Sequence, residues 1–188
     1  MDATEVSAVL ARARQGDSEA FRTLVERHSR RAFQLAFRIT GNEQDAEDVV
    51  QESFIRAYRQ LSRFEARAHF ATWLHRIVAN CSVDLIRSRR ARHEHASTDD
   101  LDAADQPETE TPNPERLATS AQIQRSVASA MADLSPLERA AFTLRHYEGR
   151  SISEISKTLG LGTSAAKHSV FRAVRKLRTA LEPLRSES

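Results

Sequence analysis

Five cations and no acid lie between residues 163 and 181, near the end of the chain. The cations are Lys167, Arg172, Arg175, Lys176 and Arg178. Guanidinium and ammonium groups bind the phosphate oxygens of nucleic acids, and polar side chains at the start of a helix can reach base edges in the major groove. The segment therefore predicts non-covalent recognition of duplex DNA.

A helix-turn-helix is expected to position these cations. Ser151 and Glu154 form a capping box that opens the first helix, and Gly160 provides the turn before the second. The residues of the second helix expected to face the core are Ala166, Val170, Val174, Leu177 and Leu181. The residues expected to face DNA are Ser164, Lys167, His168, Phe171, Arg172 and Arg175. The alternative interpretation is a basic face that contacts only water.

The composition of the 188-residue chain favours an all-α fold. Glycine and proline number five each, and no alternating run of β-branched residues is long enough to predict a strand. Residues 1–93 hold 16 Lys/Arg against 12 Asp/Glu, and residues 116–188 hold 12 against six. Residues 94–115 hold eight acids and no Lys or Arg. Two basic bodies joined by an acidic segment predict polyanionic partners.

The chain offers little for catalysis or for a cofactor. Its single cysteine, Cys81, lies on an apolar stripe, and neither a glycine-rich phosphate loop nor zinc-ligand spacing is present. His93 and His95 flank Glu94, but this pattern is more typical of a solvated hinge than of a metal site. We therefore expect no enzyme activity, no cofactor and no metal. The lone cysteine and the lack of a long apolar segment predict a cytoplasmic protein without membrane insertion.

Residues 1–92 are expected to form a helical body whose third helix has two distinct faces. A helix over residues 4–14 stops at Gln15-Gly16-Asp17, and a second helix stops at Gly41. The inward face of the third helix, residues 45–61, comprises Ala46, Val49, Val50, Ala57, Tyr58 and Leu61. The opposite face comprises Asp45, Asp48, Glu52, Arg56 and Arg59. Taken alone, this second face is expected to contact water and to complement the helix dipole.

The fourth helix, residues 70–92, and the loop before it combine aromatic and basic side chains. The helix ends in Arg87, Arg89, Arg90 and Arg92, more positive charge than a helix end needs, which indicates phosphate partners. The aromatic residues Phe64, Phe70 and Trp73 accompany Arg63 and Arg67, and such interleaving suits unstacked bases. Phe70 and Trp73 fit a hydrophobic core equally well.

The acidic segment between the two bodies, residues 93–115, is too poor in apolar residues to fold alone. Two interpretations remain open for it. It is a flexible linker, or it occupies a basic channel that otherwise receives nucleic acid.

The whole chain resembles the extracytoplasmic-function (ECF) sigma factors, group 4 of the sigma-70 family of bacterial RNA polymerase. Four features in order carry the resemblance. They are the break at Gln15-Gly16-Asp17, the block Asp45-Ala46-Glu47-Asp48-Val49-Val50-Gln51-Glu52-Ser53-Phe54, the block Thr72-Trp73-Leu74 with Arg76, Ile77 and Asn80, and the terminal helix-turn-helix. The resemblance implies region 2 over residues 1–92, a linker over 93–115 and region 4 over 116–188.

The resemblance also implies a role for each body. The residues that it assigns to docking on core polymerase are Asp45, Asp48, Gln51, Glu52 and Arg56. The residues that it assigns to binding and melting minus-ten DNA are Arg63, Phe64, Phe70, Thr72, Trp73, Arg76, Asn80 and Arg87, to which the helix end adds Arg89 and Arg90. Region 4 would bind the minus-thirty-five element, the linker would enter the polymerase channels, and the chain would act as a monomer in the holoenzyme. An anti-sigma factor and a stress or envelope response are expected as well.

One departure from the family pattern concerns the recognition helix. Many members have Gly-Thr-Val-Lys-Ser-Arg there, whereas this chain has Ser164-Ala165-Ala166-Lys167-His168-Ser169. A generic minus-thirty-five preference is therefore not assumed. The rival hypothesis is a conventional helix-turn-helix regulator, which binds its operator without polymerase and usually as a dimer.

Overall fold

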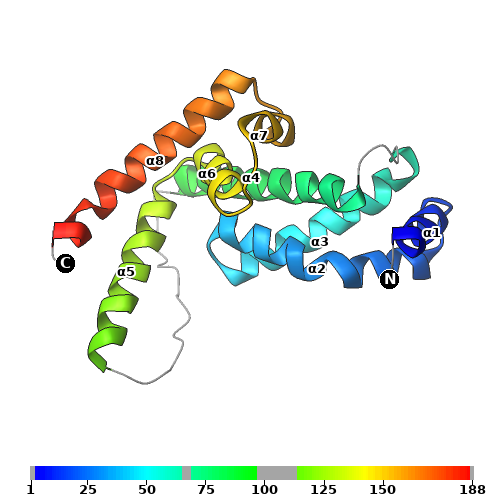
Figure 1. Cartoon of the computed structure of the whole chain (residues 1–188), viewed down its shortest axis with the longest axis horizontal. Coiled ribbons are helices and arrows are strands. Elements are labelled where there is room, and N and C mark those ends of the chain that lie inside the picture. Colours follow the sequence, from blue (N-terminus) through cyan, green and yellow to red (C-terminus); the bar gives the residue numbers. More distant parts are fainter. Residues whose placement is uncertain (1–2, 65–68, 97–113, 187–188) are drawn as a thin grey trace. The chain divides into compact units, whose positions relative to one another are not determined.

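Every regular element in the computed structural model is a helix (Figure 1). The structure describes residues 3–64, 69–96 and 114–186. The chain divides into two compact units, Met1–Leu85 and Ile86–Ser188. The all-α prediction is confirmed for the described residues. Most of the predicted linker lies outside the described residues.

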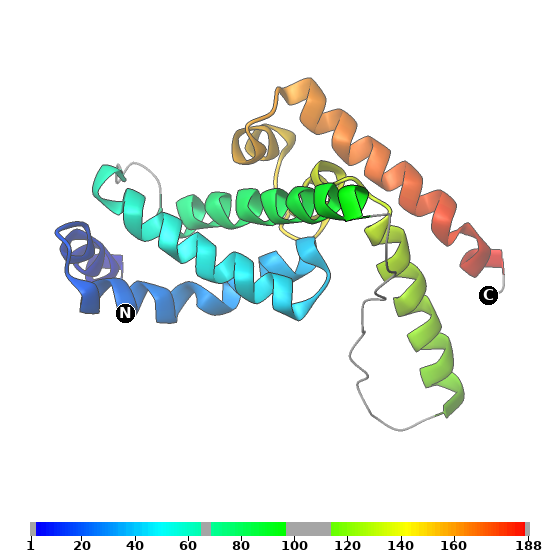
Figure 2. The same cartoon turned by 180° about the vertical axis from the view of Figure 1, so that it is seen from behind.

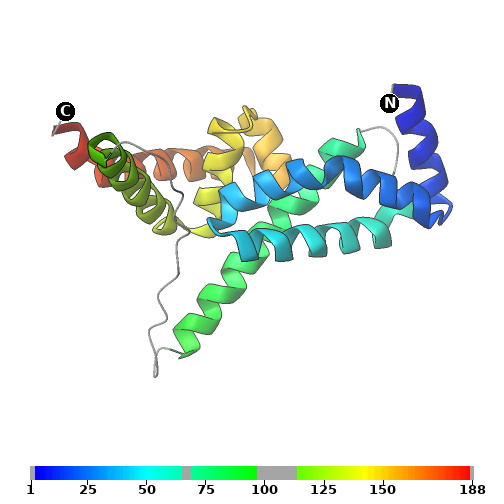
Figure 3. The same cartoon turned by 90° about the horizontal axis from the view of Figure 1, so that it is seen from below.

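The first unit is built around a pair of long helices that pack against each other. Its elements are α1 (Ala3–Arg14), α2 (Ser18–Thr40), α3 (Glu43–Gln60), the short 3₁₀ helix η1 (Leu61–Arg63) and the first part of α4 (Phe70–Ala96). The helices α2 and α3 lie side by side, and α1 packs against α2 near the N-terminus of the chain (Figures 1 and 3). α4 was predicted to end at residue 92, but it continues to Ala96. The two units divide between Leu85 and Ile86, which lies inside this helix.

The core of the first unit comes from apolar stripes at helical spacing. Leu24, Leu35 and Ile39 of α2 are almost inaccessible to water, as are Ala46 and Val49 of α3. α4 contributes Leu74, Val78, Ala79, Cys81 and Val83. On the predicted inward face of the third helix, Ala46, Val49, Ala57 and Leu61 are buried as expected. Tyr58 is an exception, because it was predicted to be buried and is 50% exposed.

Local capping defines where α2 and α3 begin and end. The Asp17 side chain accepts a hydrogen bond from the amide of Ala20 at the start of α2. Gly41 adopts a left-handed conformation, with φ of 87°, and ends α2 by donating its amide hydrogen to the carbonyl of Phe37. Asn42 then caps α3 through the amide of Asp45. These caps fix the short connection that folds α3 back along α2.

The second unit places three helices against its long last helix. After the end of α4 it contains α5 (Pro114–Ala132), α6 (Pro136–His146), α7 (Ile152–Leu159) and α8 (Thr163–Ser186). The helices α5, α6 and α7 all contact α8 (Figure 2). The predicted capping box of Ser151 with Glu154 opens α7, and a second capping box, Ser135 with Glu138, opens α6. The predicted helix-turn-helix is therefore α7, the turn at Gly160 and α8.

The turn at Gly160 depends on a backbone conformation that L-residues rarely adopt. Gly160 has φ of 64°, and its amide donates to the carbonyl of Ser156. A Cβ added there meets no atom within 4 Å, so the cost of a substitution is conformational rather than steric.

We therefore expect Gly160→Ala to lower the free energy of unfolding by about 1–2 kcal/mol. Gly160→Asn is the matched control and should lose less, because asparagine tolerates the left-handed region. Urea unfolding followed by circular dichroism measures both variants. Equal losses of stability for alanine and asparagine would show that the left-handed backbone conformation at Gly160 is not the cause of the destabilisation.

Candidate nucleic-acid interface

The exposed face of α8 carries the side chains that the sequence assigned to DNA. Ala166, Ser169, Ala173 and Leu177 pack inward and are at most 7% exposed. The assigned residues Ser164, Lys167, His168, Phe171, Arg172 and Arg175 are all exposed. Phe171 is 63% exposed, more than any other large hydrophobic residue that the structure describes. Ser169 and Ala173 are buried although the sequence pattern did not assign them to the core, and Val170 and Val174 are only half-buried.

Arg172 differs from the other assigned residues because it already has an anionic partner. Its Nε lies 3.2 Å from Oε1 of Glu138, and Nζ of Lys176 lies 2.7 Å from Oε2 of the same carboxylate. The Glu138 side chain is only 5% exposed. Burial raises the pKa of Glu138, but hydrogen bonds from Lys176 and Ser135 outweigh this and hold the pKa below its ordinary value. The sequence did not indicate this contact between α6 and α8.

The aromatic residues around the start of α4 form a packed cluster. Phe64 and Phe70 are each 4% exposed, and Trp73 is half-buried. The ring centroids of Phe64 and Trp73 are 4.8 Å apart, and those of Phe70 and Trp73 are 5.7 Å apart. Assignment of Phe64 and Phe70 to a DNA-contacting surface is therefore corrected. Their rings complete the core because burial of an aromatic side chain is strongly favourable.

A histidine that the sequence pattern did not single out packs beneath this cluster. The rings of His28 on α2 and Phe70 are 5.2 Å apart. Burial lowers the pKa of His28, and the charges of Arg27 and Arg31 lower it further. Both effects favour the neutral form of the His28 ring, which packs against Phe70 at the start of α4.

The polar residues assigned to minus-ten DNA lie on η1 and along α4. Arg63, Thr72, Arg76 and Arg87 are exposed, and Asn80 is half-buried with its amide donating to the carbonyl of Arg76. Arg89 is half-buried. Arg90 donates from Nη2 to the carbonyls of Ala132 and Leu134, at 3.0 and 2.6 Å. Arg90 thus forms hydrogen bonds within the second unit, which its assignment to minus-ten DNA did not include.

On α3, the residues assigned to core polymerase divide into three groups. Asp45 is 4% exposed and receives a hydrogen bond from the Asn42 side chain at 2.8 Å, so its place on an outward stripe is corrected. Arg56 pairs with Glu52 at 2.6 Å and with Asp84 of α4 at 3.2 Å. The hydrogen bond to Glu52 raises the pKa of Arg56. Asp48 and Gln51 are exposed, as predicted.

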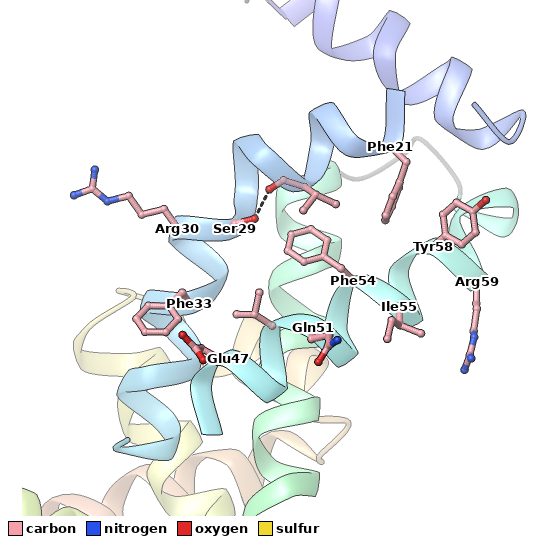
Figure 4. A pocket seen from close by; sticks show the side chains of 12 residues that line it. Phe21, Ser29, Arg30, Phe33, Glu47, Gln51, Phe54, Ile55, Tyr58 and Arg59 are labelled. Carbon is pink, nitrogen blue, oxygen red and sulfur yellow. Dashed lines mark hydrogen bonds between the residues drawn. The ribbon is translucent and has the colours of Figure 1, made fainter. Parts of the chain in front are cut away.

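An apolar groove between α2 and α3 was not predicted from the sequence. It has a volume of about 990 Å³ and includes Phe21, Phe33, Val50, Phe54, Ile55 and Tyr58 among its lining residues. Figure 4 shows Phe21 and Tyr58 meeting at one end of the groove, with Phe33 and Glu47 at the other. Ile55 is 39% exposed and belongs to neither of the two predicted faces of α3. An isoleucine outside both stripes was the signal that could have revealed the groove.

The described residues were also compared with the requirements of a membrane span and of a metal site, and they meet neither. In the ranges that the structure covers, no helix is both long and apolar enough to span a bilayer. The same ranges contain no group of three or more histidine, cysteine, aspartate or glutamate side chains placed to hold a metal.

Comparisons with known proteins match both units. A family model described as Sigma-70 region 2 matches residues 24–92, and one described as Sigma-70, region 4 matches residues 124–177. The chain is 30% identical to the ECF RNA polymerase sigma factor SigW of Bacillus subtilis, over 91% of this chain and 94% of SigW. It is 31% identical to the RNA polymerase sigma-H factor of Pseudomonas aeruginosa, over 96% and 95% of the two chains. It is 35% identical to the ECF RNA polymerase sigma factor SigE of Mycolicibacterium smegmatis, of whose length it spans 63%.

Solved structures agree with these matches. CnrH, in a complex with the cytosolic domain of CnrY, is 29% identical with a TM-score of 0.61, over 94% of this chain and 96% of CnrH. The sigma factor RpoE of Bartonella quintana, in a complex with the anti-sigma factor NepR, has a TM-score of 0.63 at 20% identity, over 86% and 96% of the two chains, and thus supports the fold. The two matched regions and the full-length relatives lead to one conclusion: the chain belongs to the ECF sigma factors of the sigma-70 family.

Proposed function

We propose that this chain is an alternative sigma factor that binds core RNA polymerase, directs it to specific promoters and helps to melt the minus-ten element. The observation that carries the proposal is that the chain exposes side chains suited to DNA at two separate places, Arg63, Thr72 and Arg76 on η1 and α4 and the cations of α8, and also exposes an apolar groove between α2 and α3. A DNA-binding surface in each unit suits a bipartite promoter, and the groove suits a protein partner. Polymerase supplies the catalysis in this scheme, and the chain supplies promoter choice.

The groove between α2 and α3 is the proposed centre of the polymerase interface. Large apolar side chains that remain exposed mark protein–protein contacts, and Ile55 and Tyr58 are 39% and 50% exposed. Glu47, Gln51 and Arg59 supply polar groups around the apolar lining. Asp48 and Glu52 would then contribute charge near the interface, where it affects the rate of association more than the affinity. Arg56 and Asp45 would act by holding α3 in place.

The proposed DNA contacts follow the exposed side chains. On η1 and α4, Arg63, Thr72, Trp73, Arg76 and Arg87 would contact the minus-ten strand, with the half-buried Trp73 offering part of its ring for stacking. In the second unit, α8 would enter the major groove of the minus-thirty-five element through its N-terminal half. Residues 1–92 and 116–188 are the proposed functional domains.

The regulation and location of the protein are inferred from its relatives. CnrH was solved with the cytosolic domain of CnrY, and RpoE with the anti-sigma factor NepR. We infer that an anti-sigma factor also controls this chain. The work of a sigma factor on polymerase places its action in the cytoplasm, and residues 93–115 would connect the two domains across the polymerase.

Transcription with purified core polymerase tests the proposed function directly. We expect promoter-specific run-off transcripts from fragmented genomic DNA only when this protein is added to core enzyme. The purified protein alone should show little specific binding to the same fragments. Tight footprints by the protein alone, without any transcript in the presence of core enzyme, would favour a conventional regulator instead.

The groove is tested by placing a charge in it. Ile55→Arg should weaken binding to core polymerase at least about tenfold, because it puts an unpaired charge in an apolar interface. Asp48→Asn on the outer face of α3 is the control and should change affinity less than about threefold. Fluorescence anisotropy of labelled protein titrated with core enzyme measures both. A larger effect for Asp48→Asn than for Ile55→Arg would show that polymerase binds the outward acidic side chains of α3 rather than the groove.

At the start of α4, buried side chains are expected to stabilise the fold, and exposed side chains are expected to contact DNA. Phe70→Ala should lower the free energy of unfolding by about 3–5 kcal/mol because the ring is buried. Thr72→Ala and Arg76→Ala should stay within about 0.5 kcal/mol of the natural protein. They should nevertheless reduce the opening of promoter DNA, measured by permanganate reactivity of minus-ten thymines in the holoenzyme complex. If Thr72→Ala and Arg76→Ala both open promoter DNA as well as the natural protein does, the exposed surface of α4 does not take part in melting.

A further inference from the structure

Glu138 occupies a position between the start of α6 and one flank of the recognition helix. Its carboxylate accepts a hydrogen bond from the amide of Ser135 at 3.0 Å, as part of the α6 capping box. The same carboxylate pairs with Arg172 at 3.2 Å and with Lys176 at 2.7 Å. One buried acid thus serves both as a helix cap on α6 and as the anionic partner of two cations on α8.

The two paired cations lie on the same flank of α8. Arg172 and Lys176 are four residues apart, so their side chains follow each other along one side of the helix. Lys167, Phe171 and Arg175 are also spaced by four and are exposed along another side. Among the described residues, Lys167 and Arg175 form no ion pair. These four cations of α8 are therefore divided between a flank bound to Glu138 and a side that is open to a ligand.

This division bears on which cations can neutralise DNA phosphates. A carboxylate that is 5% exposed requires compensation by nearby positive charge, and removal of that charge leaves it buried and unpaired. Arg172 and Lys176 would have to abandon Glu138 in order to bind DNA fully. Lys167 and Arg175 carry no such cost.

We propose that Glu138 is a positioning residue for promoter recognition, which holds Arg172 and Lys176 away from DNA phosphates and turns the Lys167–Arg175 side of α8 toward the duplex. The inference rests on the proposed function, in which α8 binds promoter DNA. The inference removes Arg172 from the predicted DNA-binding cations, because its ion pair with Glu138 holds α8 in place instead. Specific recognition then depends on a fixed rotation of α8 rather than on its total charge.

The salt dependence of promoter binding by the holoenzyme tests this proposal. The slope of log affinity against log salt concentration changes by about 0.9 for each DNA phosphate that the protein ceases to neutralise. We expect Lys167→Gln and Arg175→Gln to make the slope shallower by about that amount each. Arg172→Gln and Lys176→Gln should leave the slope unchanged to within about 0.2 on the same scale. Circular dichroism of each variant checks that the helices are intact.

A neutral isostere at position 138 provides the complementary measurement. Glutamine also serves at the third position of a capping box, so Glu138→Gln keeps the cap of α6 while it frees both cations. We expect its salt slope to become steeper by up to about 0.9 for each freed cation that reaches a phosphate. We also expect a smaller difference in affinity between promoters with the correct and a scrambled upstream element.

Two results would overturn the inference, and they differ in meaning. If Arg172→Gln and Lys176→Gln flatten the slope as much as Lys167→Gln does, both cations bind DNA and Glu138 does not withhold them. If all four single variants leave the slope unchanged and scrambling the upstream element has no effect, α8 does not bind promoter DNA. The second result contradicts the proposed function itself, whereas the first leaves it intact.

Discussion

The close packing of α2 against α3 is the constraint on which the first unit depends. Both helices bury small side chains, with Ala32 and Ala36 on α2 and Ala46 and Ala57 on α3 at most 4% exposed. Buried alanines allow helix backbones to approach closely, and the larger Leu35 and Ile39 of α2 are buried as well. The larger rings of Phe21, Phe33 and Phe54 line the groove beside this contact, and the rings of Phe21 and Phe54 meet edge to face. The candidate partner surface is thus a geometric consequence of how the core is closed.

A similar relation holds in the second unit, where the inward side of α8 determines what its outward side can present. Ala166 and Ala173 are fully buried, and Leu177 joins Ala130 and Leu134 in a core cluster. Glu138 adds a charged contact on one flank of the same helix. Apolar packing sets the distance of α8 from its neighbours, and the ion pairs limit its rotation. Both are needed if a short run of side chains is to read base edges in a consistent register.

The sequence predicted the elements of this fold well because their signals are local. Apolar spacing, the capping boxes at Ser135 and Ser151 and the glycine stops at Gly41 and Gly160 all act within a few residues of the chain. The exposed side of α8 followed from the same periodicity. The sequence also marked Phe70 and Trp73 as residues that fit a core, which the packed cluster bears out for Phe70.

Several of the failures concern charged residues whose partners lie far away in the chain. Arg56 meets Asp84 across 28 positions, Lys176 meets Glu138 across 38, and Arg90 reaches the carbonyl of Leu134 across 44. A periodic pattern states which side of a helix a residue occupies, but not whether another helix supplies a counter-charge there. The groove was missed for a related reason, since it needs α2 and α3 together.

The central claim is that polymerase docking and DNA recognition use separate surfaces of the chain. Amide hydrogen exchange tests it when the protein is measured alone, in the holoenzyme and in the promoter complex. The account predicts protection over residues 47–59 as soon as core polymerase binds. It predicts additional protection over residues 70–80 and 163–175 only when promoter DNA is added to the holoenzyme. Protection of residues 163–175 by DNA without polymerase, together with no change at residues 47–59 in the holoenzyme, would contradict it.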